Sequence, residues 1–424
     1  MTLSELRGKR IALWGFGREG ATTLAFLKDH FPDQKIIIVN NTPVDAGDHF
    51  IAEDELLDNL DMFDVIVKSP GISYYHDAVS KMTAHGIKVT SATNIWFALE
   101  KPGKVIAITG SNGKSTTSAL LHHILKSLGY NAALGGNIGT ALLSLPLDAD
   151  YYVVELSSYQ TCDMTGVPDI AVLLNLHPEH IQWHKSHEQY YHDKCNLLRR
   201  GAPVNIVNAF ETRLADTENK ICFNARDGIH FEGKTIYLSD MPVGGAADFP
   251  LLGDHNLENL CAALTIAKEL GLVLPECLKA SFSYPGLAHR MQIFGPIAER
   301  MYVNDSISTD PEATIAALNA LSDKQITLIA GGEDREQDYS DLCALIDASD
   351  NVRTICAYET GPRLFEQIKS KQKCKAKSLD EAVTLAKEIT PSDGYILLSP
   401  ASPSYDAFKD FEQRGELFMT LAKS

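Results

Sequence analysis

Short runs of isoleucine, valine and leucine recur along the chain, and most of them end at glycine or polar residues. Between these runs, apolar residues recur at helical spacing. The runs predict strands at residues 9–14, 35–39, 63–68, 87–90, 105–108, 151–155, 171–176, 302–306, 326–330, 354–358 and 395–398. Strands that alternate with helices are typical of doubly wound, mainly parallel sheets with helices on both faces. The pattern therefore predicts an α/β protein.

Two changes along the chain divide it into three parts. A Lys-Pro-Gly hinge at residues 101–103 precedes one new strand series, and residues 286–290 begin another. We therefore expect three domains: a Rossmann-like domain over residues 1–92, a central P-loop ATPase-type domain over 93–285, and a C-terminal Rossmann-like domain over 286–424. Residues 206–208 and the hairpin-like residues 229–237 predict antiparallel additions at the edge of the central sheet.

The most informative motif is a glycine turn that follows the strand 105–108. It reads Thr-Gly-Ser-Asn-Gly-Lys-Ser-Thr-Thr over residues 109–117. Backbone N–H groups at such a strand, turn and helix start can wrap a polyphosphate. Lys114 would reach the outer phosphate oxygens, and the Ser115 hydroxyl would face Mg²⁺. The residues expected at the phosphates are Gly110, Asn112, Gly113, Lys114, Ser115 and Thr116. Ile108 stands where the full P-loop pattern has its first glycine, so the match is to the shorter form.

A carboxylate lies at the end of the predicted strand 151–155. Glu155 follows four apolar residues, and a charge at a buried strand end is costly unless it is paired or binds a metal. Because the phosphate turn precedes it, Glu155 is a candidate Mg²⁺ ligand. The alternative is a strand end that water covers.

The first strand enters a second glycine turn, Gly-Phe-Gly-Arg-Glu-Gly over residues 15–20. This pattern alone fits either a nucleotide's phosphates or uridine, or a purely structural turn. In a dinucleotide fold an acidic residue after the second strand holds the ribose, and here Asn40 stands there. A nicotinamide-dependent oxidoreductase is therefore disfavoured. The third strand ends at Ser69 and Gly71, on the edge where ligands bind in such sheets.

Charge and composition narrow the class of protein. The chain of 424 residues has a formal net charge of −17, which argues against nucleic-acid and anionic-membrane partners. No apolar run has the length of a membrane span, and the N-terminal residues lack a secretion signal, so we expect a cytoplasmic protein. The eight cysteines have no metal-like spacing. An anionic substrate would need local cations, for which the candidates are Lys114, Arg290, Arg335 and Lys409.

Taken together, these segments resemble the Mur ligase family, the ATP-dependent amide ligases of peptidoglycan precursor synthesis, over essentially the whole chain. The matching motifs are residues 107–115, 155–158, His180 after Asn175-Leu176, Asn256 after His255, Arg290 after His289, and residues 304–306, 398–400 and 408–415. The turn at 15–17, Ser-Pro-Gly-Ile at 69–72 and the ending Phe-x-x-Phe-Glu-x-Arg-Gly are most similar to the branch that adds glutamate to UDP-N-acetylmuramoyl-L-alanine.

The resemblance implies a mechanism and a set of residues. ATP phosphorylates the substrate carboxylate, and the incoming amine attacks the acyl phosphate. The implied catalytic residues are Lys114, Glu155, His180 and Lys194. The resemblance also implies that Ser115 and Glu155 hold one Mg²⁺ and that His180 and carbamylated Lys194 hold a second. Asn256, Arg290 and Asp305 would contact ATP; Phe16, Arg18, Ser69, Gly71 and Asn137 the UDP-sugar; and Thr309, Arg335, Ser404 and Phe411 the glutamate. We expect a monomer. For Asn256, helix capping within residues 253–256 is the alternative.

The chain departs from the family pattern where glutamate binds. Ile307 replaces a common lysine, Gly-Gly-Glu-Asp-Arg at 331–335 replaces Gly-Gly-Asp-Gly-Lys, and Ser-Pro-Ser at 402–404 replaces Cys-Ala-Ser. We therefore predict glutamate and leave its handedness open, because these departures are similar to those of a related subgroup that adds L-glutamate. D-glutamate is slightly ahead on base rate, with L-glutamate as the alternative. The remaining alternatives are a ligase for another amino acid, a folate-extending ligase, which would lack the first domain, and a non-catalytic nucleotide-binding regulator.

Overall fold

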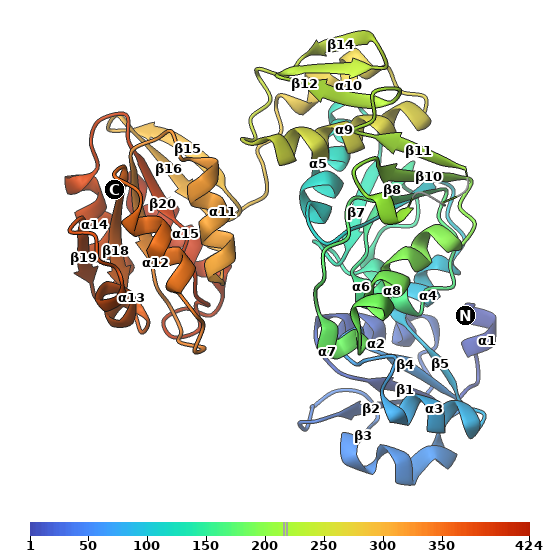
Figure 1. Ribbon diagram of the computed structural model, residues 1–424. Coiled ribbons are helices and arrows are strands. Elements are labelled where there is room, and N and C mark those ends of the chain that lie inside the picture. The colour runs from blue at the N-terminus through green and yellow to red at the C-terminus, as the bar shows by residue number, and fades with distance from the viewer. Residues whose placement is uncertain (215–216, 218) are drawn as a thin grey trace. The chain divides into compact units, whose positions relative to one another are not determined.

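The computed structural model describes residues 1–214, 217 and 219–424. The chain divides into two compact units, Met1–Tyr284 and Pro285–Ser424. Within the described residues, strands and helices alternate around three sheets (Figure 1), which confirms the predicted α/β class. No helix in this part of the chain is long and apolar enough to cross a membrane. The predicted boundaries of three domains stay a prediction.

The first sheet of the first unit has the strand order β3-β2-β1-β4-β5, and all neighbours are parallel. Strands β1 and β4 are buried along their whole length, as expected for strands covered on both faces. The bounds are β1 Ile11–Trp14, β2 Ile36–Asn40, β3 His49–Ala52, β4 Val65–Lys68, β5 Lys88–Thr90, α1 Leu3–Leu6, α2 Arg18–His30, η1 Glu53–Met62, α3 Asp77–Ala84 and α4 Ala92–Phe97. The order reverses between β1 and β4, where open α/β sheets bind ligands.

The second sheet of this unit has the order β14-β13-β12-β11-β10-β9-β6-β8-β7. Its bounds are β6 Lys104–Thr109, β7 Ala132–Gly136, β8 Tyr151–Glu155, β9 Ile170–Leu173, β10 Val204–Asn208, β11 Lys220–Phe223, β12 Ile229–Glu232, β13 Thr235–Leu238, β14 Met241–Gly245, α5 Lys114–Ser127, η2 Leu142–Ser144, α6 Ser158–Cys162, α7 Ile181–His184, α8 His187–Arg199, η3 Thr212–Leu214, α9 Asp254–Glu269 and α10 Leu274–Ser281.

Two predictions for this sheet have different outcomes. The hairpin predicted at residues 229–237 is present, because β12 and β13 pair antiparallel and β14 extends them. The prediction for residues 206–208 is wrong, since β10 pairs parallel with β9 and β11. Helix α8 lies between β9 and β10 along the chain, and a helical crossover returns the chain to the same direction.

The second unit contains one sheet among the described residues, in the order β15-β16-β20-β17-β18-β19. The hairpin of β15 and β16 is antiparallel, and the other neighbours are parallel. The bounds are β15 Gln292–Ile297, β16 Arg300–Asn304, β17 Ile326–Ala330, β18 Val352–Ala357, β19 Lys373–Ala376, β20 Tyr395–Leu398, α11 Pro311–Ala320, α12 Ser340–Asp347, α13 Gly361–Gln367, α14 Leu379–Ile389 and α15 Phe411–Lys423.

A fully buried arginine fixes the carboxyl edge of this sheet. Arg414 is 0% exposed, and its guanidinium donates to the carbonyl oxygens of Ser402 (3.1 Å), Pro403 (3.2 Å) and Ser306 (2.9 Å), and to the Ser306 hydroxyl (3.0 Å). A planar group with five donors can bond several acceptors at once. Arg414 therefore joins the loop after β16 to the loop after β20.

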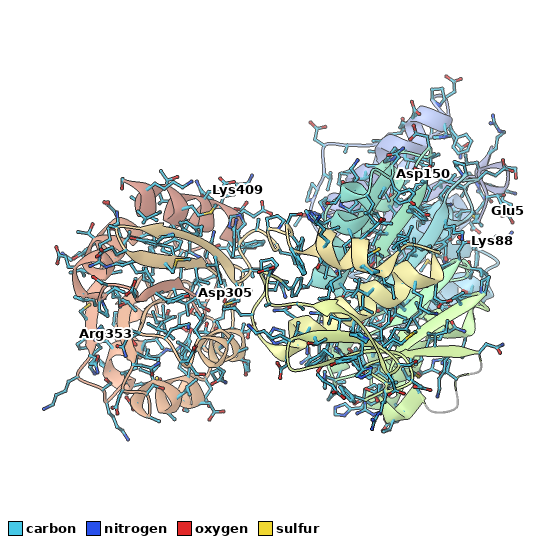
Figure 2. The ribbon with its side chains drawn as sticks, turned by 90° about the horizontal axis from the view of Figure 1, so that it is seen from above. Glu5, Lys88, Asp150, Asp305, Arg353 and Lys409 are labelled. Atoms are coloured by element: carbon cyan, nitrogen blue, oxygen red, sulfur yellow. The ribbon has the colours of Figure 1, made fainter. Side chains whose placement is uncertain are left out.

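We predict that Arg414→Ala lowers the free energy of opening of this edge by at least about 3 kcal/mol, because several buried carbonyl groups lose their donor. Hydrogen exchange of peptides from residues 302–306 and 398–404, read by mass spectrometry, measures this local stability. Fluorescence is less suitable, since all three tryptophans lie in the first unit. Lys409→Ala is the control, because Lys409 is an exposed cation of the same segment (Figure 2). Equal hydrogen-exchange rates of these peptides in Arg414→Ala and Lys409→Ala would contradict the prediction.

Candidate active site

The glycine turn lies between β6 and α5, as the sequence predicts. Gly113 has a φ of 80° and precedes Lys114, the first residue of α5. A left-handed residue directly before a helix suits glycine, which has no Cβ. Ser115 and Thr116 occupy the first turn of the helix, where backbone N–H groups have no partner within the helix. Such a helix start attracts phosphate groups.

Side chains from distant segments hold this turn in place. The backbone N–H of Asn112 donates to Asn175 Oδ1 (2.8 Å), and Asn175 Nδ2 donates back to the backbone carbonyl oxygen of Asn112 (3.1 Å). The Ser111 hydroxyl contacts the carbonyl oxygen of His177 (2.8 Å) and the Tyr190 hydroxyl (2.7 Å). The loop after β9 and helix α8 therefore define the shape of the turn.

Two lysines approach the turn from different elements. Lys114 Nζ donates to the Ser111 carbonyl oxygen (2.6 Å), and Lys194 Nζ, from α8, donates to the Gly110 carbonyl oxygen (2.7 Å). Lys194 is 1% exposed. Burial, together with the nearby charge of Lys114, lowers the pKa of Lys194 to about 7. A large share of Lys194 is therefore a neutral amine at neutral pH.

Glu155, at the end of β8, is 0% exposed. Its Oε1 accepts a hydrogen bond from Asn137 Nδ2 (2.7 Å). Its Oε2 is buried and has no hydrogen-bond partner among the described residues. A buried carboxylate oxygen without a donor is costly unless a cation meets it, and a carboxylate with the Ser115 hydroxyl is the kind of oxygen set that Mg²⁺ prefers. The residues present therefore fit a divalent cation.

His180 precedes the short helix α7 and adopts a left-handed conformation with a φ of 55°. Partial burial, together with the charges of Lys194 and Lys114, lowers the pKa of His180, while Glu179 opposes the shift. The nearby charge of Glu155 raises the pKa of Lys194 and so opposes the effect of burial. Lys194 thus lies within electrostatic range of the other three predicted catalytic residues, Lys114, Glu155 and His180.

Asn256 is linked to the glycine turn through a residue that sequence reasoning missed. Asn256 Oδ1 accepts from Asn259 Nδ2 (3.2 Å), and Asn259 Oδ1 accepts from the Thr117 hydroxyl (3.2 Å). Helix α9 begins at Asp254 with Gly253 as its N-cap, so Asn256 lies in the first turn and the capping alternative for it is wrong. The spacing of three residues between Asn256 and Asn259 places both on one helix face and could have indicated the second.

The residues predicted to surround the UDP-sugar lie at the carboxyl edge of the first sheet, except for one. Phe16 N donates to Asn40 Oδ1 (3.2 Å), so the residue that argues against NAD supports the turn. Arg18 is exposed at the start of α2, and Ser69 N donates to the Trp14 carbonyl oxygen (2.8 Å). The exception, Asn137, follows β7, where its side chain is bonded to Glu155.

The remaining predicted residues belong to the second unit. The Asp305 carboxylate accepts hydrogen bonds from Met291 N (3.0 Å), Ser308 Oγ (2.5 Å) and Ser399 Oγ (2.8 Å), and burial raises the pKa of Asp305. The contact with Ser399 brings the loop after β16 and the loop after β20 together at one sheet edge. Arg290 is exposed, next to the buried His289.

The predicted glutamate residues lie along the same edge. Arg335 Nε donates to Glu333 Oε2 (2.8 Å), and its guanidinium carbon lies 5.6 Å from the centre of the Tyr405 ring. Ser404 is buried, whereas Thr309 and Phe411 are half-buried. Arg335 is thus an exposed guanidinium that an acid and a ring already orient.

Comparisons with known proteins agree with this arrangement. A family model of the Mur ligase middle domain matches residues 108–267, and one of the Mur ligase, glutamate ligase domain matches residues 289–402. A protein of Xanthomonas oryzae pv. oryzae (strain MAFF 311018) named UDP-N-acetylmuramoyl-L-alanine--L-glutamate ligase is 36% identical over 454 residues, covering 100% of this chain and 97% of its own. A Micromonospora protein of the same name is 34% identical, covering 99% and 97%.

A solved structure supports the fold. The MurF ligase from Thermotoga maritima in complex with ADP has a TM-score of 0.59 and 17% sequence identity, and the match covers 97% of this chain and 95% of that chain. Two family models that together match more than half of the chain, relatives similar over its full length and a glycine turn beside a buried carboxylate lead to one conclusion: the chain belongs to the Mur ligase family.

Proposed function

We propose that the protein is an ATP-dependent ligase of peptidoglycan precursor synthesis, which joins the amino group of L-glutamate to the carboxyl group of UDP-N-acetylmuramoyl-L-alanine. The names of the relatives support this acceptor and this amino acid, which places the protein in the MurD branch. The first sheet supports a UDP-linked acceptor rather than folate, since folate-extending ligases lack that domain. The division into three domains, with bounds at residues 92 and 285, is part of this proposal.

The observation that carries the proposal is that Glu155 Oε2 is buried without a hydrogen-bond partner among the described residues. Glu155 pairs with Ile108 of β6, the strand that leads into the glycine turn. Glu155 and Ser115 would hold Mg²⁺, and Lys114 would neutralise charge on the phosphoryl group in transfer. Bound there, Mg²⁺ supplies positive charge to the phosphate oxygens. The chain's own contribution is a rigid turn whose N–H groups, lysine and hydroxyl converge on one polyphosphate.

A second cation site is proposed at His180 and Lys194. A lysine must be neutral to react with CO₂, and the lowered pKa of Lys194 favours that form. The resulting carbamate is an anion with two oxygen ligands, so it fits a divalent cation where an ammonium group would repel it. The bond from Lys194 Nζ to the Gly110 carbonyl oxygen places this group at the phosphate turn.

We further propose a cytoplasmic monomer.

The proposed handedness of glutamate is supported by the names of the relatives rather than by the site. Both relatives are named for L-glutamate, so we prefer the L-isomer to the D-isomer, which is slightly ahead on base rate alone. The three departures from the family pattern, around Ile307, Arg335 and Ser404, lie at residues proposed to bind this substrate. A guanidinium binds a carboxylate through two parallel bonds, which a lysine cannot do.

The decisive test is a phosphate-release assay with ATP, Mg²⁺, UDP-N-acetylmuramoyl-L-alanine and either isomer of glutamate. We expect phosphate release that requires the acceptor and is at least tenfold faster with L-glutamate than with D-glutamate. A preference for D-glutamate would overturn the proposed isomer but not the proposed reaction. Phosphate release at the same rate with and without UDP-N-acetylmuramoyl-L-alanine would overturn the whole proposal.

We predict that Gly113→Ala abolishes nucleotide binding, because a Cβ there would lie 2.4 Å from Asn259 Oδ1 and φ is positive. The matched control is Gly129→Ala. Gly129 has a φ of 89° and open space around its Cβ position, so it reports the backbone strain alone, about 1 kcal/mol or more. Calorimetric titration with ADP and Mg²⁺ compares the two. Unchanged ADP affinity in Gly113→Ala would contradict the proposed nucleotide site.

We predict that Arg335→Ala raises the KM for glutamate at least tenfold and the KM for ATP less than twofold, because the lost guanidinium serves a glutamate carboxylate. Steady-state kinetics with each substrate varied in turn measures both constants. Lys371→Ala is the control, because it removes an exposed cation of the same unit that is not proposed to bind a substrate. Similar increases in both KM values would reject the assignment of Arg335.

A further inference from the structure

The segment after β4 is tied to the helices that follow β9. Trp183 Nε1 donates to the Gly71 carbonyl oxygen (3.2 Å), and Ser73 Oγ donates to the Trp183 carbonyl oxygen (2.7 Å). The Tyr75 hydroxyl donates to Asp193 Oδ1 (2.7 Å). Three hydrogen bonds thus join residues 71–75 of the first sheet to α7 and α8 of the second.

Asp193 is the centre of this connection. It is 1% exposed, and its carboxylate also contacts Gln189 Nε2 (2.8 Å) and His184 Nδ1 (2.6 Å). Charge-assisted hydrogen bonds to a buried carboxylate are short and strong. The loss of one donor is costly, because it leaves part of the carboxylate's negative charge buried without a partner. The next residue along α8 is Lys194. The orientation of this part of α8 therefore depends on the bonds of Asp193.

His184 extends the connection to α6. Its Nδ1 faces Asp193, and its Nε2 lies 3.0 Å from Ser158 Oγ. Serine, histidine and aspartate in this order match the geometry of a hydrolase triad. Ser158 is 3% exposed and His184 0% exposed, so no substrate reaches the hydroxyl. The arrangement therefore orients helices and does not act as a nucleophile.

Helix α7 has little stability of its own, which makes these bonds decisive. It has four residues, Ile181–His184, and is flanked by two left-handed residues, His180 (φ 55°) and Lys185 (φ 75°). Residues other than glycine adopt this conformation only where the surroundings enforce it. The contacts of Trp183 and His184 stabilise these left-handed conformations, and they fix the backbone from which His180 projects.

We propose that Tyr75, Asp193 and His184 form a positioning relay, through which the segment that carries Ser69 and Gly71 sets the orientations of His180 and Lys194. This inference rests on the proposed function, in which Ser69 and Gly71 contact the UDP-sugar and His180 and carbamylated Lys194 bind a cation. The relay residues touch neither substrate nor cation. They align the two ligands, as outer partners of metal ligands do, and losing such a partner costs about 10- to 100-fold in metal affinity.

The test compares Tyr75→Phe, which removes one hydroxyl, with the neighbouring Tyr74→Phe, which removes a hydroxyl from a ring that is 41% exposed. Binding of Mg²⁺ to the full-length protein with ADP is measured by calorimetry. Carbamate on Lys194 is measured by NMR after incubation with ¹³C-labelled bicarbonate, with Lys194→Gln as the blank. For Tyr75→Phe we expect about tenfold weaker Mg²⁺ binding, a smaller carbamate signal and an unchanged KM for glutamate. Tyr74→Phe should match the unchanged protein.

A second variant, Asp193→Asn, keeps an acceptor for Tyr75 but removes the charge that faces His184. It should weaken Mg²⁺ binding to a similar extent. Equal Mg²⁺ affinity and carbamate signal in Tyr75→Phe and Tyr74→Phe would reject the relay, and so would a lower melting temperature with unchanged Mg²⁺ affinity. If the unchanged protein carries no carbamate and Lys194→Gln is fully active, the second cation site of the proposed function fails. That outcome would also reject the relay, because it removes the cation whose two ligands the relay aligns, whereas the cation site at Glu155 and the ligase activity are tested separately by the phosphate-release assay.

Discussion

The site depends on a glycine turn that is held from outside itself. Asn175 clamps Asn112, Tyr190 meets Ser111, Lys194 reaches the Gly110 carbonyl oxygen, and Asn259 faces Gly113. Each of these residues comes from a segment well separated from the turn in sequence. A phosphate loop binds well only when its N–H groups already converge, because reorganisation on binding would weaken the interaction. The fold therefore supplies the rigidity that the short turn lacks.

Buried polar groups around the turn explain why this rigidity coexists with reactivity. Most of them are paired: Asp193 has Tyr75, Gln189 and His184 as partners. Glu155 differs, since one of its carboxylate oxygens is buried without a partner among the described residues. Lys194 also differs, because burial and a neighbouring lysine destabilise its charged form. The proposed chemistry thus uses a buried carboxylate oxygen without a partner among the described residues and a lysine whose charged form is destabilised.

Much of this arrangement could be predicted from the sequence. Apolar runs located many of the strands, although β3, β7, β11, β14, β15 and β19 were missed. Gly110, Glu155 and Asp305, at or directly after the ends of predicted strands, lie at strand ends in the structure. Parallel strands collect their carboxyl ends at one edge, so local patterns sufficed for these residues. The direction of β10 was mispredicted because a short apolar run carries no information about its neighbours.

The supporting contacts could not be predicted in this way. Tyr75 and Asp193 are 118 positions apart, and Asn259 is 142 positions from Thr117. No periodicity or motif links such pairs, because they form only when two sheets or a sheet and a distant helix pack together. Asn137 illustrates the same limit, since its bond to Glu155 depends on the neighbouring positions of β7 and β8. Sequence patterns therefore identify the reactive groups, whereas tertiary packing identifies what positions them.

A crystal structure of the protein with ADP and Mg²⁺ tests the central claim most directly. The account predicts the β-phosphate against the backbone N–H groups of residues 113–115 and an Mg²⁺ ion in contact with Glu155 Oε2. Density for the nucleotide away from this turn, or an Mg²⁺ ion that does not touch Glu155, would contradict it.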